Sequence, residues 1–217
     1  AVFIQGQSIA SAAAHVADIR AKAEAHGRDG ADVKVVSGMT VTVAPTTDQA
    51  RALRAEYEAL LGLDDAAVMF AGITGIDLTG VDPDTRLVDL RTDYGQTLVD
   101  RYAKSDPDVR VRGVLDQFRT KAIRGFQITG NPEEVADEIE AIIDGSGIDG
   151  LMLEPTFGGP DSYRAFIDLV LPILVDRGRA SAPAPTLRER FTGRPRLSPT
   201  HRAHRLTASA ASTPVPA

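Results

Sequence analysis

The 217-residue sequence contains no cysteine and no tryptophan, and aromatic residues make up only 5% of it. The absence of cysteine excludes a disulfide framework, a thiolate metal site and a cysteine nucleophile. It also fits the reducing cytoplasm, which is the compartment we expect for this protein. No apolar run reaches the ~18 residues that are needed to span a bilayer, so we expect no membrane segment.

An initiating methionine is also missing, and the chain opens directly on the apolar run Ala1–Gln5. This opening lacks the basic region followed by an apolar stretch that marks a signal peptide. A chain that starts inside a strand-like run is what remains when the true beginning is absent. We therefore expect the sequence to be part of a longer protein.

Charge is unevenly distributed along the chain. The net charge is −6, and residues 180–217 contain six arginines and one glutamate, which leaves −11 for the rest. An acidic body argues against nucleic acid as a partner, because phosphate contacts need clustered lysine and arginine. The basic end is rich in proline, alanine and serine, so it is interpreted as a tail.

Apolar periodicity predicts three buried strands and four helices outside one irregular stretch. Ser8, the Thr46/Gln49 pair and the Asn131/Glu134 pair are predicted helix N-caps, and Pro172 should kink the last helix. The strands are expected at 2–5, 33–43 and 150–154, and the helices at 8–26, 47–61, 131–144 and 160–177.

Residues 63–128 are punctuated by glycine and proline, and no single period covers them. Short helical patches are expected near 96–103 and 114–122. A connection of this length inside a compact domain is usually functional or mobile. We interpret it as an insertion and expect it to be the least ordered part of the folded body.

The order of elements is typical of a parallel sheet covered by helices. Three strands are too few to close a barrel, which needs eight. The pattern therefore indicates either part of a barrel or a small open α/β sheet, and the open sheet would leave the insertion without a purpose.

No catalytic set stands alone in the sequence. His201 and His204 have a spacing that could hold a metal, but no carboxylate lies near them in sequence, and we predict no metal site. A run of cations in the insertion forms either a solvated face or a cationic lid over an anionic cofactor or substrate. Its members are Arg110, Arg112, Arg119, Lys121 and Arg124.

Several segments in order resemble the bacterial-luciferase-like flavin-dependent monooxygenases. Residues 129–137 are similar to the family's "G-[TSN]-P-E-x-V-A-D" run, and 148–153 to its "G-x-D-G-F" strand. Residues 166–174 resemble its "F-x-D-x-V-x-P-x-L" helix, 186–189 match its "T-L-R-E", and 25–29 its "A-x-x-G-R-D" segment. The branch with the greatest similarity is that of nitrilotriacetate and dibenzothiophene-sulfone monooxygenases.

This resemblance implies a (β/α)8 TIM barrel that uses reduced FMN and O2 on a small organic substrate, with a separate flavin reductase. The chain would supply about strands 6 to 8, and a homo-oligomer is expected. Residues 1–179 would be the partial barrel, with the insertion at 63–128 before the last helix-strand-helix unit, and 180–217 would be the tail.

The family's serine-rich phosphate-binding stretch lies before the point where this chain starts, so no known flavin contact can be carried over. Barrel sites lie at the carboxyl ends of strands, which makes Gln5, Gly38 and Glu154 the candidate cofactor-binding or substrate-facing residues. Two alternatives stay open. One is a non-catalytic barrel remnant or interaction module that folds by pairing with another chain, and the other is a deazaflavin-dependent oxidoreductase of the same superfamily.

Overall fold

The computed structural model describes residues 1–91, 96–121, 125–155, 159–180 and 186–197, together with 199, 201 and 203. By internal contacts the chain divides into two units, Ala1–Leu174 and Val175–Ala217. The sheet, the helices that cover it and the insertion all belong to the first unit.

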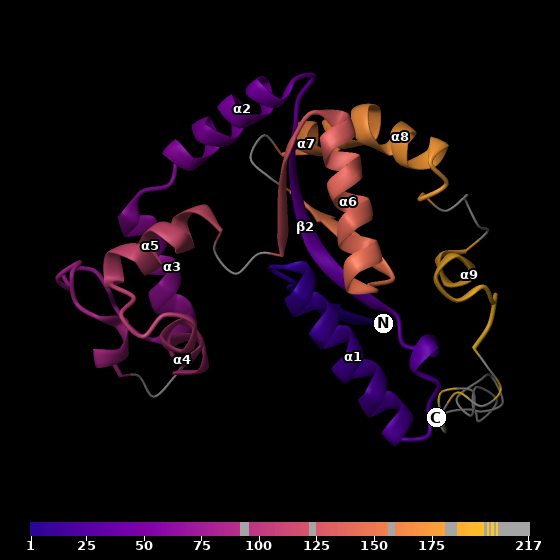
Figure 1. The fold of residues 1–217 in the computed structure, drawn as a ribbon, viewed down its shortest axis with the longest axis horizontal. Coiled ribbons are helices and arrows are strands. Elements are labelled where there is room, and N and C mark those ends of the chain that lie inside the picture. Colours follow the sequence, from indigo (N-terminus) through magenta and orange to yellow (C-terminus); the bar gives the residue numbers. More distant parts are fainter. Residues whose placement is uncertain are drawn as a thin grey trace, which may run out of the picture. The chain divides into compact units, whose positions relative to one another are not determined.

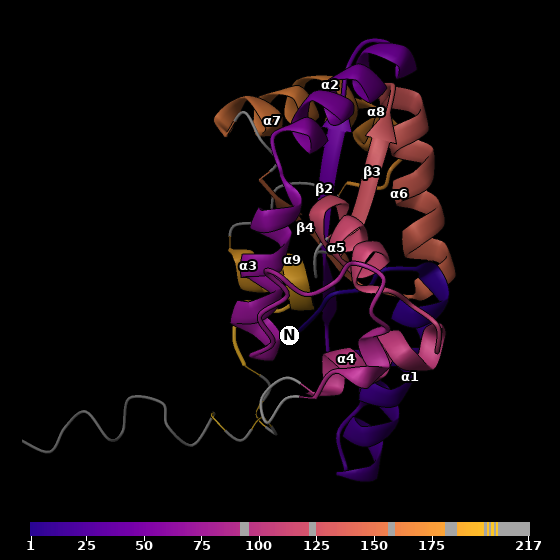
Figure 2. The ribbon, with the colours of Figure 1, turned by 90° about the vertical axis from the view of Figure 1, so that its left-hand side faces the viewer.

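The first unit is built around a parallel sheet with its longest strand in the centre (Figure 2). Lys34 O accepts the Val2 amide, whereas Val35 O accepts the Asp149 amide, so β1 and β4 pair with opposite edges of β2. The strand β3 pairs with β2 farther along the edge that β1 uses. The strands are β1 (Val2–Ile4), β2 (Val35–Val43), β3 (Phe126–Gly130) and β4 (Gly150–Glu154).

The central strand β2 is nearly all buried, as its run of β-branched residues predicts. The edge strands β1 and β4, which the sequence predicted as buried, are only partly covered: Phe3 and Met152 are each 47% exposed. The prediction of three strands was also wrong. Phe126 and Ile128 are buried and alternate with less buried neighbours in β3, so the insertion ends before residue 126 and not at 128.

Two helices pack against each other beside the sheet (Figure 1). They are α1 (Ile9–Ala25) and α6 (Pro132–Ser146). The caps at Ser8 and at Asn131/Glu134 are confirmed: the Ser8 side chain accepts the Ser11 amide, and Asn131 and Glu134 form a reciprocal capping box. At the start of the helix after β2, the Thr46 hydroxyl accepts the Gln49 amide. A Cβ on Gly145 would lie 2.7 Å from Ile9 Cγ2, so this glycine allows the two helices to approach closely.

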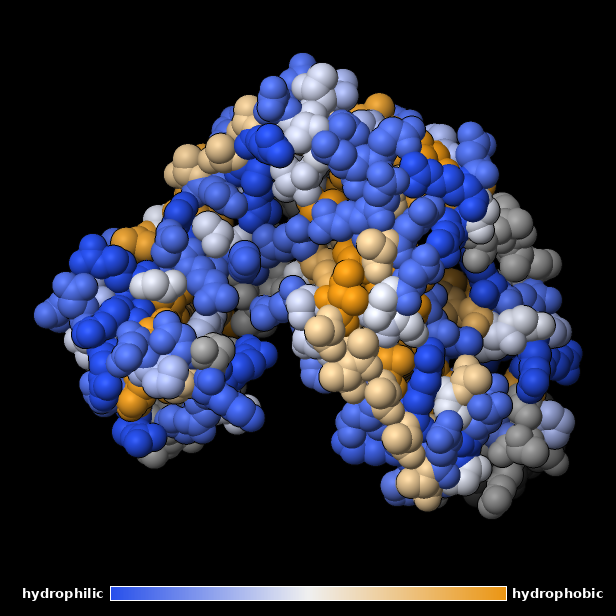
Figure 3. All heavy atoms as spheres, in the orientation of Figure 1, coloured by the Kyte–Doolittle hydropathy of each residue, from blue (hydrophilic) through white to orange (hydrophobic). Residues whose placement is uncertain are grey.

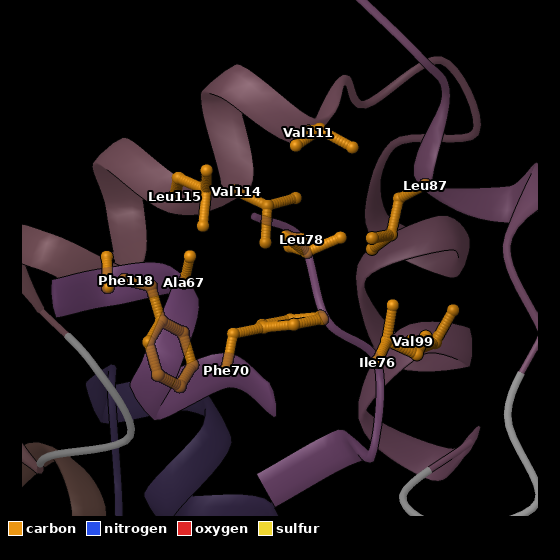
Figure 4. Close-up of a cluster of buried hydrophobic side chains, with 11 residues drawn as sticks. Ala67, Phe70, Ile76, Leu78, Leu87, Val99, Val111, Val114, Leu115 and Phe118 are labelled. Carbon is orange, nitrogen blue, oxygen red and sulfur yellow. The ribbon is translucent and has the colours of Figure 1, made fainter. Parts of the chain in front are cut away.

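The helix α2 (Thr47–Ala59) follows β2 and leads into the insertion, which has a hydrophobic core of its own (Figure 4). Phe70 and Phe118 are fully buried and meet edge to face, with ring centroids 5.6 Å apart. One glycine of the insertion ends a helix: Gly75 is the left-handed cap after Thr74. The elements are α3 (Leu63–Thr74), η2 (Leu87–Asp89), α4 (Gln96–Ser105) and α5 (Val111–Thr120); the short η1 (Gly30–Asp32) precedes β2.

The predicted kink near Pro172 takes the form of a π-helical turn between two short helices. Proline lacks the N–H that a continuous helix would donate, which disturbs the turn before it. Val170 and Leu174 are buried, whereas Ile167 is 51% exposed. The segments are α7 (Pro160–Ala165), η3 (Phe166–Val170) and α8 (Leu171–Asp176), and the second unit contains α9 (Leu187–Thr192).

Hydrophilic residues cover most of the face shown in Figure 3, but a band of apolar residues runs over the region where Figure 1 places α1. This helix is rich in alanine, and Ala10, Ala14 and Ala17 are exposed on it. No helix of the part of the chain that the structure describes is long and apolar enough to cross a membrane.

Candidate functional site

The three residues expected at the carboxyl ends of the strands lie together, but the expectation was wrong for Gly38, which lies in the middle of β2 because that strand continues to Val43. Gln5 follows β1 and Glu154 ends β4, and Gln5 Nε2 donates a hydrogen bond to Glu154 Oε1 at 3.1 Å. Both side chains lie over Gly38 of β2. A Cβ at this position would lie 2.7 Å from Glu154 Oε1 and 2.8 Å from Gln5 Oε1. The glycine therefore provides the space in which the amide and the carboxylate meet.

Thr40 extends this cluster and was missed in the sequence. In the parallel register it pairs with Glu154 on one side and with Gln127 on the other, so the three side chains share one face of the sheet. Thr40 is 2% exposed, and its hydroxyl has no hydrogen-bond partner in the structure. Such a buried, unsatisfied group needs an explanation, and a bound molecule or water is the simplest. The two-residue strand period from Gly38 could have identified it.

The backbone around Gly38 is tightly constrained. The Gly6 amide donates to Ser37 Oγ at 3.1 Å, which holds the turn after β1 against β2. On the neighbouring segment, a Cβ on Gly125 would lie 2.1 Å from Gly38 O. The site therefore rests on backbone contacts that only glycine permits at residue 125.

At the far ends of β2 and β3, the N-termini of α2 and α6 are tied together by one carboxylate. Glu134 Oε2 accepts from the Thr47 hydroxyl at 2.6 Å and from the Asn131 amide at 3.0 Å. The hydrogen bond from Thr47, then that from Asn131, holds the pKa of Glu134 below its ordinary value. This contact fixes the two helices that follow the strands beside the candidate site.

Three of the cations proposed as a lid, Arg110, Arg112 and Arg119, are held by local partners and not by the Gln5–Glu154 pair. Arg110 Nη1 donates to Asp84 O at 2.6 Å, and Arg112 forms an ion pair with Asp84 at 3.3 Å. Arg119 Nη1 instead donates to Glu58 O at 2.9 Å. Arg124 lies outside the described residues.

No cluster of potential metal ligands exists among the residues that the structure describes. His201 Nδ1 accepts the Ala203 amide at 3.1 Å, and His204 lies outside the described residues. What the cluster at the strand ends offers is hydrogen bonding: a carboxylate, a carboxamide and a buried hydroxyl on one sheet face. Such groups can orient a polar ligand beside a partly apolar surface.

Known proteins of similar sequence match most of the chain. Dimethyl-sulfide monooxygenase of Hyphomicrobium sulfonivorans is 32% identical over 181 residues, which are 82% of this chain and 37% of that protein. Long-chain alkane monooxygenase of Geobacillus thermodenitrificans is 27% identical over 198 residues, 89% of this chain and 40% of that protein. The chain thus spans less than half the length of these relatives.

Solved structures give the same result. The crystal structure of a riboflavin lyase with modified FMN and riboflavin superposes with a TM-score of 0.77 at 36% identity, covering 89% of this chain and 42% of that one. The crystal structure of long-chain alkane monooxygenase superposes with a TM-score of 0.75 at 26% identity, and the match covers 94% of this chain and 44% of that one. The family model of luciferase-like monooxygenases matches residues 1–183. This chain therefore belongs to the luciferase-like monooxygenase family.

Proposed function

We propose that the chain is part of an FMNH2-dependent monooxygenase that oxidises a small organic molecule with O2, with reduced FMN supplied by a separate reductase. The observation that carries this proposal is the Gln5–Glu154 pair, which lies at the carboxyl ends of the parallel strands β1 and β4 and over Gly38 in the middle of β2. In barrel enzymes this edge of the sheet carries the reacting groups. The relatives include a nitrilotriacetate monooxygenase described as component A, a name that implies a second component.

In this proposal β1, β2 and β4 are strands 6 to 8 of a (β/α)8 barrel. Their order across the sheet, β1-β2-β4, is the sequential order that a barrel requires, and β3 prolongs the edge that β1 begins. The chain matches 37% of the length of dimethyl-sulfide monooxygenase, which is close to three of eight barrel units. The partial exposure of Phe3 and Met152 leaves apolar surface for the remaining strands to cover.

The described residues fit one part of a flavin site. Gln5, Thr40 and Glu154 could hold the polar edge of the flavin ring or of the substrate, whereas the cluster holds no cation for a phosphate. Bound reduced FMN would supply the electrons that activate O2. The side chains would orient the ligand, and Glu154 would accept a proton or a hydrogen bond at its carboxylate. The phosphate would then be held by the strands that precede this chain in its relatives.

Flavin titration separates this proposal from a self-sufficient small domain. The 217-residue chain alone should bind FMN weakly, with a dissociation constant above about 1 μM, as read from quenching of flavin fluorescence. Submicromolar binding by the chain alone would contradict the partial-barrel proposal.

A chimera tests the site itself. Residues 1–183 would replace the matching segment of dimethyl-sulfide monooxygenase, and FMN binding should be regained. Glu154→Gln in that chimera should weaken flavin binding or oxygenation, whereas Lys104→Met, on an exposed part of α4, should change neither. A chimera that folds but binds no flavin would favour a non-catalytic remnant.

A further inference from the structure

A small pocket lies between the insertion and the helix that leads into it. Its volume is about 90 Å³, and it is formed by residues of α2, α3, α5 and β3, together with Leu61 and Lys121. None of Gln5, Gly38, Thr40 and Glu154 lines it. Its lining residues are Arg54, Tyr57, Leu61, Asp65, Ala66, Met69, Phe118, Arg119, Thr120, Lys121 and Gln127.

Two arginines of the pocket are fixed in place by their hydrogen bonds. Arg54 Nε donates to Glu58 Oε1 at 2.7 Å, and Arg54 Nη2 donates to Thr120 O and Gln127 Oε1 at 2.6 and 2.8 Å. Arg119 is paired with Asp116 and also donates to Glu58 O. These guanidinium groups are largely neutralised by their partners, so they give the pocket shape and some residual positive potential.

Lys121 differs from both arginines. Its ammonium group forms no ion pair or hydrogen bond with any residue that the structure describes, although its backbone oxygen accepts from Gln127 Nε2 at 2.9 Å. The carboxylate that lines the pocket, Asp65, already accepts the Gly62 amide at 2.8 Å, closing the N-terminus of α3. Among the cations that line the pocket, Lys121 is therefore the one that forms no ion pair with a described residue.

Part of the lining is apolar. Met69 is 44% exposed, Phe118 is buried in the insertion core, and the guanidinium carbon of Arg54 lies 5.5 Å from the centroid of the Tyr57 ring. An exposed methionine beside a half-buried tyrosine is a surface that gains from being covered. The lining thus combines apolar residues with a lysine that forms no ion pair with a described residue, around a space too small for a nucleotide.

We infer that this pocket binds a small organic carboxylate with an apolar body, such as a short chain or a single ring. The carboxylate lies at Lys121, and the body covers Met69 and Tyr57. The inference goes beyond the proposed monooxygenase function and stands independently of it. A ligand of this kind would also bridge α2 and the insertion, since the lining residues come from both.

The test is a titration of the isotope-labelled 217-residue chain with benzoate, followed by amide chemical shifts in NMR spectra. Benzoate should saturate and shift the amides of Leu61, Lys121 and Gln127. Benzyl alcohol, which lacks the charge, and inorganic phosphate, which lacks the ring, should each bind at least about fivefold more weakly.

Two lysine variants provide the matched comparison. Lys121→Met should weaken benzoate binding about two- to fivefold, since it removes one solvent-exposed charge, and Lys104→Met on exposed α4 should leave binding unchanged. Equal effects of the two variants, shifts that do not saturate, or phosphate binding as tightly as benzoate would each overturn the inference.

Discussion

Gln5 and Glu154 are 149 positions apart in the sequence, yet Gln5 Nε2 donates a hydrogen bond to Glu154 Oε1. The contact exists because β1 and β4 pair with opposite edges of β2 in a parallel register. Two polar side chains from the outer strands can therefore meet above the central strand, at the one position where the central residue has no side chain. The contact depends on the register of the three strands and on the missing side chain at Gly38. Neither Gln5 nor Glu154 alone would define the site.

Two glycines near this contact should respond differently to alanine. At Gly38 the new methyl group would meet the mobile ends of Glu154 and Gln5, whereas at Gly125 it would meet the Gly38 carbonyl at 2.1 Å. Gly38→Ala should therefore separate the two side chains at a cost below about 1 kcal/mol, and Gly125→Ala should cost about 3 kcal/mol because the backbone must move.

Chemical denaturation of the two variants measures the difference. A Gly38→Ala variant that is as unstable as Gly125→Ala would show that the Gln5–Glu154 pair is rigidly held.

The sequence predicted secondary structure correctly where a long apolar stripe was bounded by capping residues. The apolar stripe of α6 and its Asn131/Glu134 box predicted that helix correctly. The alternation of Phe126 and Ile128 was short and followed glycine-rich sequence, so β3 was missed. Whether Gln5 and Glu154 would touch could not be predicted, because contact depends on which strands are neighbours and in what register.

The insertion illustrates a second limit. Its glycines and prolines suggested irregular structure, but Gly75 and Gly80 adopt positive φ angles between ordered elements, and the apolar residues around Phe70 gather from five separate segments. A core assembled from short pieces has no single period along the sequence, so periodicity cannot reveal it.

Arg54 should contribute to stability more than any exposed arginine of α2. Its side chain is 15% exposed and connects Glu58, the Thr120 carbonyl and Gln127. Replacing Arg54 with methionine keeps the apolar stem but leaves these acceptors unsatisfied, and we expect a loss of about 2 kcal/mol in the free energy of unfolding.

Arg51→Met is the matched control, because the Arg51 side chain is 72% exposed and lies 3.8 Å from Asp48. Its effect should stay within about 0.5 kcal/mol. Equal losses in urea unfolding of the two variants would contradict the bridging role of Arg54.

Glu134 should make stability depend on pH. The Thr47 hydroxyl and the Asn131 amide lower the pKa of Glu134 from its ordinary value of 4.5. Because the folded-state pKa is below the unfolded one, the contribution is complete above pH 4.5 and is lost as the pH falls through the folded-state value. The stability difference between wild type and Glu134→Gln should thus shrink between neutral pH and about pH 3. A difference that is constant over this range would exclude the charged hydrogen bonds as its cause.

The insertion core should unfold as a unit if Phe70 is removed. Phe70 is 0% exposed and packs on Phe118, so Phe70→Ala should cost about 4 kcal/mol. Val68→Ala, on the same helix at 66% exposure, should change stability by less than about 0.5 kcal/mol. Hydrogen exchange should quicken in α3 and α5 while β2 keeps its protection. Faster exchange in β2 as well would show that the insertion and the sheet unfold together.

The last prediction concerns the state of the chain in solution. Phe3 and Met152 are apolar residues on the outer strands of the sheet, and each is 47% exposed. The free edges of β1 and β4 carry backbone donors and acceptors that other strands can pair with. Each hundred Å² of apolar surface that becomes covered contributes about 2.5 kcal/mol. We therefore expect the 217-residue chain to self-associate, as measured by light scattering after size-exclusion chromatography.

Substituting these two positions tests the cause. Phe3→Ser with Met152→Ser should reduce association, because it removes the apolar surface without touching the strand backbone. Lys22→Ser, a change on the exposed part of α1 far from both strands in sequence, should leave association unchanged. A wild-type chain that elutes as a stable monomer of 23.1 kDa and unfolds cooperatively would contradict the partial-barrel proposal. The reason is physical: a sheet whose outer strands need partners should not remain monomeric when those strands are exposed.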